Sequence, residues 1–263
     1  MSLATYSFEN GIATIVINNP PQNRLSKDLM FEFAGMLEQL KNTQGLRGVF
    51  LRSEGPDFSF GGDITPWLDR EDEQTRQESD AAIMICNAFE DLPVPVVVAI
   101  QGRCAGGGLE MALRADVLVA AEDASFSHPE KTIGVFTLLG GVQRVADRVG
   151  RTRAMKWALT AEAVSAQEAL DAGLITQLVP QAELLSACDE WLAQLSTGPT
   201  LAHTAHKKLL RAWSNGGVKA ADNLMTDMAV DIFKSEDARN AIEGAIKAFL
   251  AGEERPTFEF NGK

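Results

Sequence analysis

Apolar and polar positions alternate in blocks along the first two thirds of the chain. The segment "IATIVI" at residues 12–17 is rich in β-branched side chains and stops at "NNPP", which predicts a strand ended by a turn. Apolar residues then recur at helical spacing between Ser26, a candidate N-cap, and Gly45, which predicts a helix. The same order recurs with a strand at 48–53 and an amphipathic helix over 78–91.

Two continuous apolar runs extend the alternation. "VPVVVAI" at 94–100 and "DVLVAAED" at 116–123 are typical of strands buried on both faces of a parallel sheet. The first 180 or so residues therefore indicate successive βα units and an α/β fold.

Helical periodicity alone fills the last part of the chain. Ser165, with Glu168 three residues on, forms a capping box for a helix that Gly173 ends. Further helices are predicted over 182–196, 200–213, 218–234 and 236–251, with glycine or proline breaks near 198, 216 and 252. We therefore divide the chain into a core with the active site, residues 1–198, and a helical C-terminal region, residues 199–263.

Composition narrows the classes of protein. With 45% hydrophobic and 23% charged residues, the chain has the usage of an ordinary globular protein. Its net charge of -12 repels a phosphate backbone, so we expect no nucleic-acid partner. No stretch reaches the roughly 18 apolar residues of a membrane span, and the N-terminus has no leader pattern. We expect a cytoplasmic protein; its opening Met1-Ser2-Leu3 is a candidate cloning scar.

Cysteines and histidines give no sign of a disulfide framework or a metal site. Cys86, Cys104 and Cys188 are odd in number and far apart, which indicates reduced thiols. The three histidines have no metal-ligand spacing, and we interpret His128 as a structural hydrogen-bonding group.

The stretch "VPVVVAIQGRCAGGGLEMAL" at 94–113 carries the most suggestive chemistry. It lacks the third glycine of a dinucleotide fingerprint and the GK[ST] of a phosphate loop. A strand, a glycine turn and a helix start remain, which leave backbone N–H groups without intrahelical acceptors, suited to a developing anion. Close packing is the simpler explanation of three glycines. Glu110, however, lies in the first turn of an apolar helix, where a buried carboxylate needs a reason.

A second carboxylate and a second glycine turn occur elsewhere. Glu130 follows Pro129 at a strand end or a helix start in "SFSHPEKTIGV". "FSFGGDI" at 58–64 follows a strand, and its Asp63 is most simply an N-cap for the next segment. The N–H of Gly62 in this turn is able to face the same point as that of the first glycine turn.

Together these stretches resemble the crotonase superfamily, the enoyl-CoA hydratase/isomerase family, over nearly the whole chain. The resemblance is carried by "NPPQNRLS", "FSFGGDI", "IQGRCAGGGLEMALRAD", "AAEDASFSHPEKTIGV", "GGVQRV", "LTAEAVSAQEALDAGLITQLVP" and "AFLAGEERPTF". It implies a spiral of ββα units with a helical C-terminal part that builds a homotrimer or a dimer of trimers. It also implies an acyl-CoA substrate, no metal, and no cofactor beyond the coenzyme A of the substrate.

Residue by residue, the resemblance implies an oxyanion hole made by the N–H groups of Gly62 and Gly107. It implies that Glu110 and Glu130 hold one water and add it across an α,β-double bond. The positions that it implies for substrate binding are Arg24, Phe60, Asp63, Ile64, Leu138 and Leu139.

This chain departs from the family's pattern in two places. Phe60 to Asp63 replace Ala-Gly-Ala-Asp and Thr65 replaces a lysine, while Phe136 to Leu139 replace a Pro-Gly-rich loop before the "GGVQRV" turn. A phosphate contact is therefore expected to be missing and the acyl pocket to be reshaped. Both glutamates favour an enoyl-CoA hydratase. The alternatives are a double-bond isomerase using one carboxylate, and a thioester-binding protein with little turnover.

Overall fold

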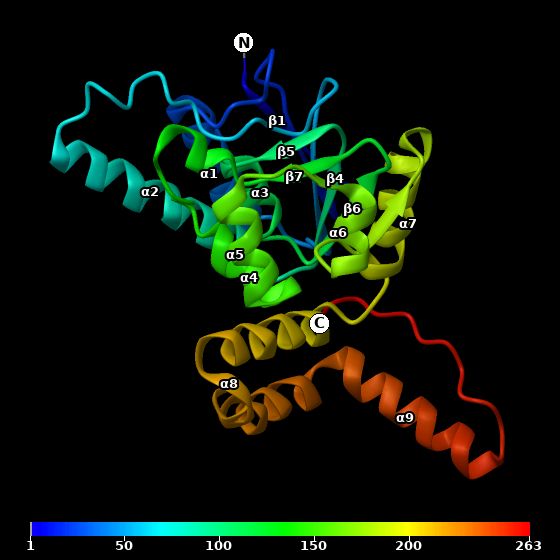
Figure 1. Cartoon of the computed structure of the whole chain (residues 1–263). Coiled ribbons are helices and arrows are strands. Elements are labelled where there is room, and N and C mark those ends of the chain that lie inside the picture. The colour runs from blue at the N-terminus through cyan, green and yellow to red at the C-terminus, as the bar shows by residue number, and fades with distance from the viewer. Residues whose placement is uncertain (1) are drawn as a thin grey trace.

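The computed structural model describes residues 2–263, so Met1 of the candidate cloning scar lies outside the described residues. A six-stranded sheet forms the centre of the fold, in the order β1-β2-β3-β4-β6-β9 (Figure 1). Only β1 is antiparallel to its neighbour, β2. The strands of this sheet are β1 Ala4–Glu9, β2 Ile12–Ile17, β3 Gly48–Ser53, β4 Val96–Ile100, β6 Val117–Ala121 and β9 Gln177–Val179.

A smaller, three-stranded sheet has the order β5-β7-β8 and lies beside the large one. Its strands are β5 Arg103–Ala105, β7 Ser125–Ser127 and β8 Val164–Ser165. The helices are α1 Lys27–Lys41, α2 Asp72–Glu90, α3 Gly107–Ala112, η1 Pro129–Ile133, α4 Gly141–Val149, α5 Arg151–Thr160, α6 Ala166–Ala172, η2 Gln181–Glu183, α7 Leu184–Ser196, α8 Thr200–Lys234 and α9 Glu236–Ala251.

Strand β4 shows why the central strands are apolar throughout. Its Val96, Val98 and Ile100 belong to the main core, together with α1 and α3, whereas Val97 and Ala99 pack with α7 on the opposite face. Both faces of the strand are thus covered, and alternate positions have no route to solvent. The prediction of buried parallel strands is confirmed.

Helix caps agree with the sequence. Ser26 Oγ accepts a hydrogen bond from Leu29 N (3.2 Å), and Ser165 Oγ accepts one from Glu168 N (3.2 Å). Helix α6 ends, as predicted, at Gly173, which has a left-handed φ of 82°. The predicted break near 216 is a kink at Gly216 and Gly217 inside α8.

Three local predictions need correction. Helix α1 ends at Lys41, before Gly45, and α2 starts at Asp72 rather than at 78 because its first turns are polar and carry no periodic apolar signal. The segment "GGVQRV" is not a turn: only Gly140 is left-handed (φ 88°), and Gly141 is the first residue of α4. The sequence did not predict this helix start, because a Gly-Gly pair is more typical of a turn than of the first residues of a helix.

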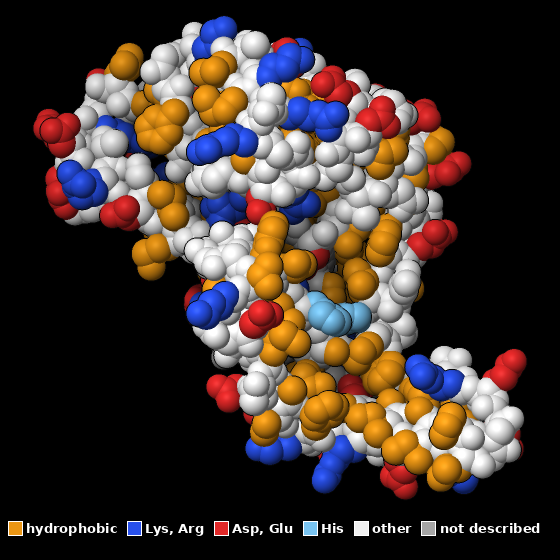
Figure 2. Space-filling model, turned by 60° about the horizontal axis from the view of Figure 1, so that its bottom comes forward, with side chains coloured by type: hydrophobic (Ala, Val, Ile, Leu, Met, Phe, Trp, Pro, Cys, Tyr) orange, Lys and Arg blue, Asp and Glu red, His pale blue; other side chains and the backbone are white. Residues whose placement is uncertain are grey.

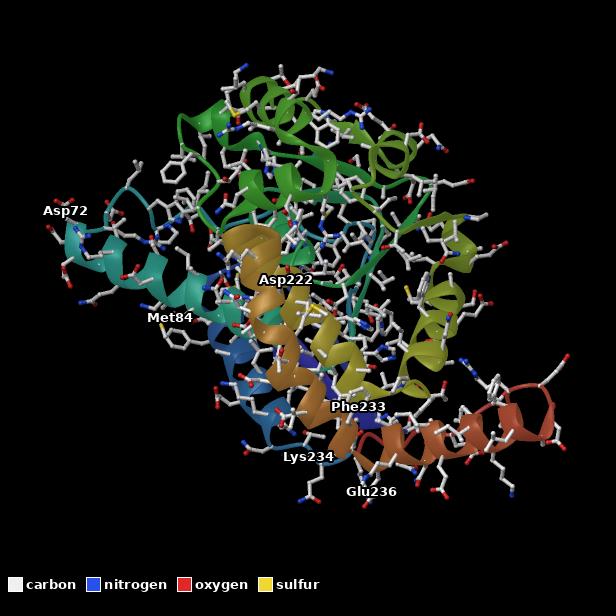
Figure 3. All side chains as sticks on the ribbon, turned by 90° about the horizontal axis from the view of Figure 1, so that it is seen from below. Asp72, Met84, Asp222, Phe233, Lys234 and Glu236 are labelled. Atoms are coloured by element: carbon white, nitrogen blue, oxygen red, sulfur yellow. The ribbon has the colours of Figure 1, made fainter. Side chains whose placement is uncertain are left out.

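Helices α8 and α9 form a layer below the α/β core, and the two halves of α8 lie side by side (Figure 1, Figure 3). Figure 3 shows α9, beginning at Glu236, running away from the core. Within residues 2–263 no helix combines the length and apolar character that crossing a membrane requires. The division predicted between 198 and 199 lies between α7 and α8 and stays a prediction.

Candidate active site

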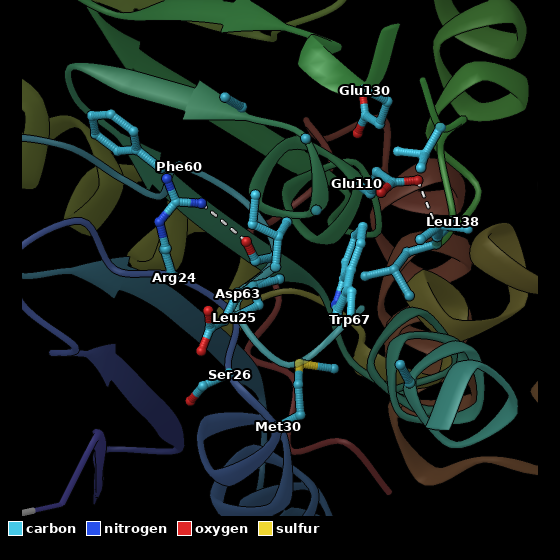
Figure 4. Close-up of a pocket in the computed structure, with 18 of the residues that line it drawn as sticks. Arg24, Leu25, Ser26, Met30, Phe60, Asp63, Trp67, Glu110, Glu130 and Leu138 are labelled. Atoms are coloured by element: carbon cyan, nitrogen blue, oxygen red, sulfur yellow. Dashed lines mark hydrogen bonds between the residues drawn. The ribbon is translucent and has the colours of Figure 1, made fainter. Parts of the chain in front are cut away.

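A cavity of about 820 Å³ opens between α1, α2, the start of α3 and the segment from η1 to α4 (Figure 4). Its walls bring together every residue that the sequence predicted for the site, although these come from segments more than 100 positions apart. They are Arg24, Phe60, Gly62, Asp63, Ile64, Gly107, Glu110, Glu130, Leu138 and Leu139.

The two glycine turns meet at one point of this cavity. Their neighbouring amides are engaged: Asp63 N donates to Leu25 O (3.2 Å), and Gly106 N donates to Ser127 O (3.0 Å). Within the described part of the chain, the N–H groups of Gly62 and Gly107 have no such acceptor. For Gly107 this follows from its place at the first position of α3, where an N–H has no intrahelical partner.

Steric limits explain why these turns contain so many glycines. Gly61 has a φ of 93°, and a Cβ there would lie 2.9 Å from Ala105 O and 3.0 Å from Gly107 N. A Cβ on Gly108 would lie 2.6 Å from Ser59 Cβ. Close packing therefore accounts for Gly61 and Gly108, whereas Gly107 lines the cavity and its N–H has no acceptor among the described residues.

Glu110 projects from the first turn of α3 and is only 2% exposed. Its Oε1 accepts hydrogen bonds from Leu139 N and Gly141 N, both at 2.8 Å. Burial raises the pKa of this carboxyl to about 7, with a further rise from Glu130, while the two amides hold the pKa down. A carboxyl with this pKa is able both to take and to give a proton near neutral pH.

Glu130 enters the same region from η1, after Pro129 (Figure 4). Its side chain is 12% exposed, and burial raises its pKa above the usual range. Its Oε2 has no hydrogen-bond partner among the described residues. The side of the cavity with the two glutamates thus contains two carboxyl groups whose protonated forms are favoured by burial.

The interpretation of His128 as a hydrogen-bonding group is wrong. Its side chain is buried, and within residues 2–263 neither ring nitrogen has a hydrogen-bond partner; Nδ1 lies 3.9 Å from Glu130 Oε2. Burial lowers the pKa of His128 to about 4, so the imidazole is neutral at pH 7. The start of α4 packs closely against the ring: a Cβ on Gly141 would lie 2.6 Å from His128 Cε1.

At another part of the cavity, Arg24 Nη1 donates to Gly62 O (3.0 Å), which fixes the peptide of that turn (Figure 4). The Phe60 ring has the guanidinium groups of Arg24 and Arg103 at 6.0 and 5.0 Å from its centroid. Asp63 does not begin a helix; its Oδ1 accepts from Thr65 N (3.0 Å) and Thr65 Oγ1 (2.7 Å) and closes a turn.

Leu138 and Leu139 line the cavity while both are half-buried. Leu139 also packs against the main core, and its Cδ1 would lie 3.6 Å from a Cβ on Gly107, beside the glycine turns. Ile64 is exposed at the rim.

Sequence reasoning missed Trp67 and Arg114. The Trp67 ring lies against Gly62, and a Cβ added to Gly62 would lie 3.3 Å from the ring. In the sequence, the signal for this residue was a tryptophan in an otherwise polar loop. Arg114 lies behind the cavity, and the signal there was a charge within the apolar stretch "LEMALRAD". Within residues 2–263 no cluster of three or more His, Cys, Asp or Glu side chains is arranged to hold a metal ion.

Comparisons with known proteins agree with this site and fold. A family model described as "Enoyl-CoA hydratase/isomerase" matches residues 7–263. A probable enoyl-CoA hydratase of Bacillus subtilis (strain 168) is 29% identical over 251 residues, covering 94% of this chain and 96% of the relative. A short-chain-enoyl-CoA hydratase of Clostridium acetobutylicum is 26% identical, covering 91% of this chain and 92% of the relative.

Among solved structures, an enoyl-CoA hydratase from Geobacillus kaustophilus HTA426 superposes with a TM-score of 0.90 at 26% identity. The superposition covers 100% of this chain and 98% of that one. The expected crotonase-type α/β fold with a helical C-terminal region is confirmed.

Proposed function

Because this chain belongs to the enoyl-CoA hydratase/isomerase family, we propose that it adds water across the α,β-double bond of an acyl-CoA thioester. The observation that carries the proposal is the convergence of two carboxyl groups and two unengaged amides on one cavity. Named hydratases among its relatives, which match over more than nine tenths of the chain, support the same reaction.

In this proposal the thioester oxygen accepts hydrogen bonds from Gly62 N and Gly107 N. Negative charge that moves onto this oxygen as the β-carbon is attacked is stabilised by the two fixed donors. The N-terminal end of α3 adds a favourable field for the same charge.

Glu110 and Glu130 then act on one water. The Oε1 atom of Glu110 is engaged by Leu139 N and Gly141 N, which leaves Oε2 for the water. One carboxylate takes a proton from the water as its oxygen bonds to the β-carbon, and the other carboxyl group protonates the α-carbon. The raised pKa values suit both roles near neutral pH.

Glu110→Gln and Glu130→Gln test this assignment. Each amide keeps the shape of the side chain but transfers no proton, so we expect hydration to fall about 10²- to 10⁴-fold while thioester binding survives. The substrate panel covers short, long, branched and aromatic enoyl-CoA thioesters, and product mass records the added water. Glu32→Gln is the matched control, because Glu32 also accepts two backbone amides, from Leu3 and Ala4, but is not one of the residues that line the cavity. Near-normal turnover in either glutamine variant of the cavity would remove that residue from the mechanism.

The family description also names isomerases, and isomerisation needs only one of the two carboxylates. Product mass separates the two reactions, since an isomerised product has gained no water. Binding without turnover across the whole panel would instead indicate a thioester-binding protein.

We also propose that the chain forms a homotrimer or a dimer of trimers. Its accessible surface is 14487 Å², whereas a compact monomer of 28.4 kDa exposes about 11,000 Å². Apolar side chains gather over the C-terminal helices (Figure 2). The large apolar side chains more than half exposed in α8 and α9 are Leu210, Val218, Met225, Phe233, Ile246, Phe249 and Leu250.

We also propose that the protein is cytoplasmic, because its three cysteines are free thiols.

A further inference from the structure

Arg114 is a buried cation just after α3, with a side chain that is 1% exposed. Its Nη1 donates to Asn87 Oδ1 (2.5 Å) and to Glu90 Oε2 (2.9 Å), and its Nη2 donates to Leu139 O (2.5 Å). A buried charge is costly unless it is paired. One N–H group of Arg114 is nevertheless bonded to a backbone carbonyl, in a loop 25 residues further along the chain. That loop is the one that reaches the catalytic cavity.

Leu139 connects Arg114 to Glu110. Its carbonyl accepts from Arg114, while its N–H donates to Glu110 Oε1 (2.8 Å). Gly141 N donates to the same carboxylate oxygen (2.8 Å), after Gly140 has turned the chain in a left-handed conformation. The turn 139–141 is thus bonded on one side by the guanidinium of Arg114 and by that of Arg144, which donates to Gly140 O (3.1 Å). On its other side the turn bonds the Glu110 carboxylate.

The anchor behind Arg114 is itself fixed. Glu90 at the end of α2 receives two hydrogen bonds from Arg144 of α4, Nε to Oε1 at 2.9 Å and Nη2 to Oε2 at 2.6 Å. Arg211 of α8 lies 3.8 Å from the same carboxylate. Arg114 therefore has little freedom to follow the turn if the turn moves.

We propose that Arg114 is a positioning residue that holds the 139–141 turn, so that the turn's two amides fix the Glu110 carboxylate in the cavity. This inference rests on the proposed hydration at the same site. The hydrogen bonds from Arg114 through Leu139 to Glu110, however, are present in the structure whatever reaction takes place. A bidentate, planar cation suits the task because it bonds a carboxylate and a carbonyl at once, which a lysine ammonium does with less directional control.

The groups that face Glu110 set the direction of the expected effect. Glu130 raises the Glu110 pKa, while Arg114 and the two amides lower it. Neutral His128, the Cys86 thiol, whose pKa burial raises to about 11, and Arg144, which donates to Gly140 O (3.1 Å), also lie near this carboxyl or its turn. Removing Arg114 takes away a nearby cation and loosens both amide donors, and each change favours the protonated acid. The pKa of Glu110 should therefore rise.

Arg114→Met tests the inference, because methionine fills most of the space with neither charge nor donor. We expect kcat at neutral pH to fall about 10- to 100-fold, as a misplaced catalytic group does, with KM nearly unchanged. The limb of the kcat–pH profile that reports Glu110, the acid limb if it takes the proton and the alkaline limb if it gives it, should move up by about one unit. Arg114→Lys should lie between the wild type and Arg114→Met in both readouts.

Arg148→Met is the matched control. Arg148 is a half-buried arginine, and its Nη2 donates to Leu113 O (3.0 Å) and Ala115 O (2.8 Å), the carbonyls on either side of Arg114. It does not bond the 139–141 turn, so its loss should lower the melting temperature without moving the pH profile. A folded Arg114→Met with the wild-type profile, or with the same changes as Arg148→Met, overturns the proposal.

Two further measurements test the role of Arg114 if Arg114→Met does not fold or if the wild type has no hydratase activity. If Arg114→Met does not fold, Arg114→Lys is compared with Arg148→Lys, and equal profiles in these two overturn the proposal. If the wild type hydrates no thioester, the proposed reaction fails, and the Glu110 carboxyl is titrated directly by infrared difference spectroscopy against Glu110→Gln. A midpoint higher in the Arg114 variant supports the positioning role without any turnover, and an unchanged midpoint refutes it.

Discussion

Replacing Glu110 by glutamine should make the protein more stable at high pH. Glu110 is buried and its pKa is raised from 4.5 to about 7. Folding therefore favours its protonated form, and the resulting stability is complete below about pH 4.5 and is lost as the pH rises through 7. Glutamine has no charge to bury, while its side-chain oxygen still accepts from Leu139 N and Gly141 N.

The size of this change in unfolding free energy follows from the pKa shift of Glu110. Moving a pKa from 4.5 to about 7 corresponds to about 3 kcal/mol of unfolding free energy, spread over that pH window. For a chain of this length, 1 kcal/mol moves the melting temperature by roughly 2–4 °C. The melting temperature of Glu110→Gln relative to wild type should thus rise by roughly 5–10 °C between pH 5 and pH 8.

Thermal melts of the two proteins at a series of pH values measure this difference. Glu32→Gln is the control of opposite sign, because hydrogen bonds from Ser2 and Ala4 lower the pKa of Glu32 and its charge therefore favours folding. That variant should gain no stability as the pH rises. A melting-temperature difference between Glu110→Gln and wild type that stays constant from pH 5 to pH 8 would refute the reasoning about burial.

Two other predictions concern the acyl chain and the assembly. If Leu138 or Leu139 limits the cavity, its replacement by alanine should favour longer acyl chains by nearly fourfold per methylene, since each is worth about 0.8 kcal/mol. An unchanged chain-length profile in specificity constants, with a loss of roughly 2 to 5 kcal/mol in stability, would show that both are core residues. Light scattering at micromolar concentration should give a trimer or a hexamer, and a monomeric mass would contradict the interface assigned to α8 and α9.

Local sequence information was sufficient wherever one segment's own pattern decides its structure. The strands at 12–17 and 48–53 have the predicted bounds, because β-branched runs between turn residues have few other ways to be buried. Ser26 and Ser165 cap their helices as expected, since a cap bonds an amide three residues on. The resemblance to a family added the ten cavity residues, and the fold brings them together.

Contacts between distant segments were settled only by the tertiary structure. The bond from Leu139 N to Glu110 spans 29 residues, and the bond from Arg114 to Leu139 O spans 25. Neither end has a periodic signal: Leu139 acts through its backbone, which every residue possesses, and Arg114 is one charge just after the apolar helix α3. His128 failed in the same way, because whether a buried imidazole finds a partner depends on chain packed around it from α4. Sequence pattern records which side chains leave water, whereas the partners that they meet there are fixed by how the sheets and helices close around them.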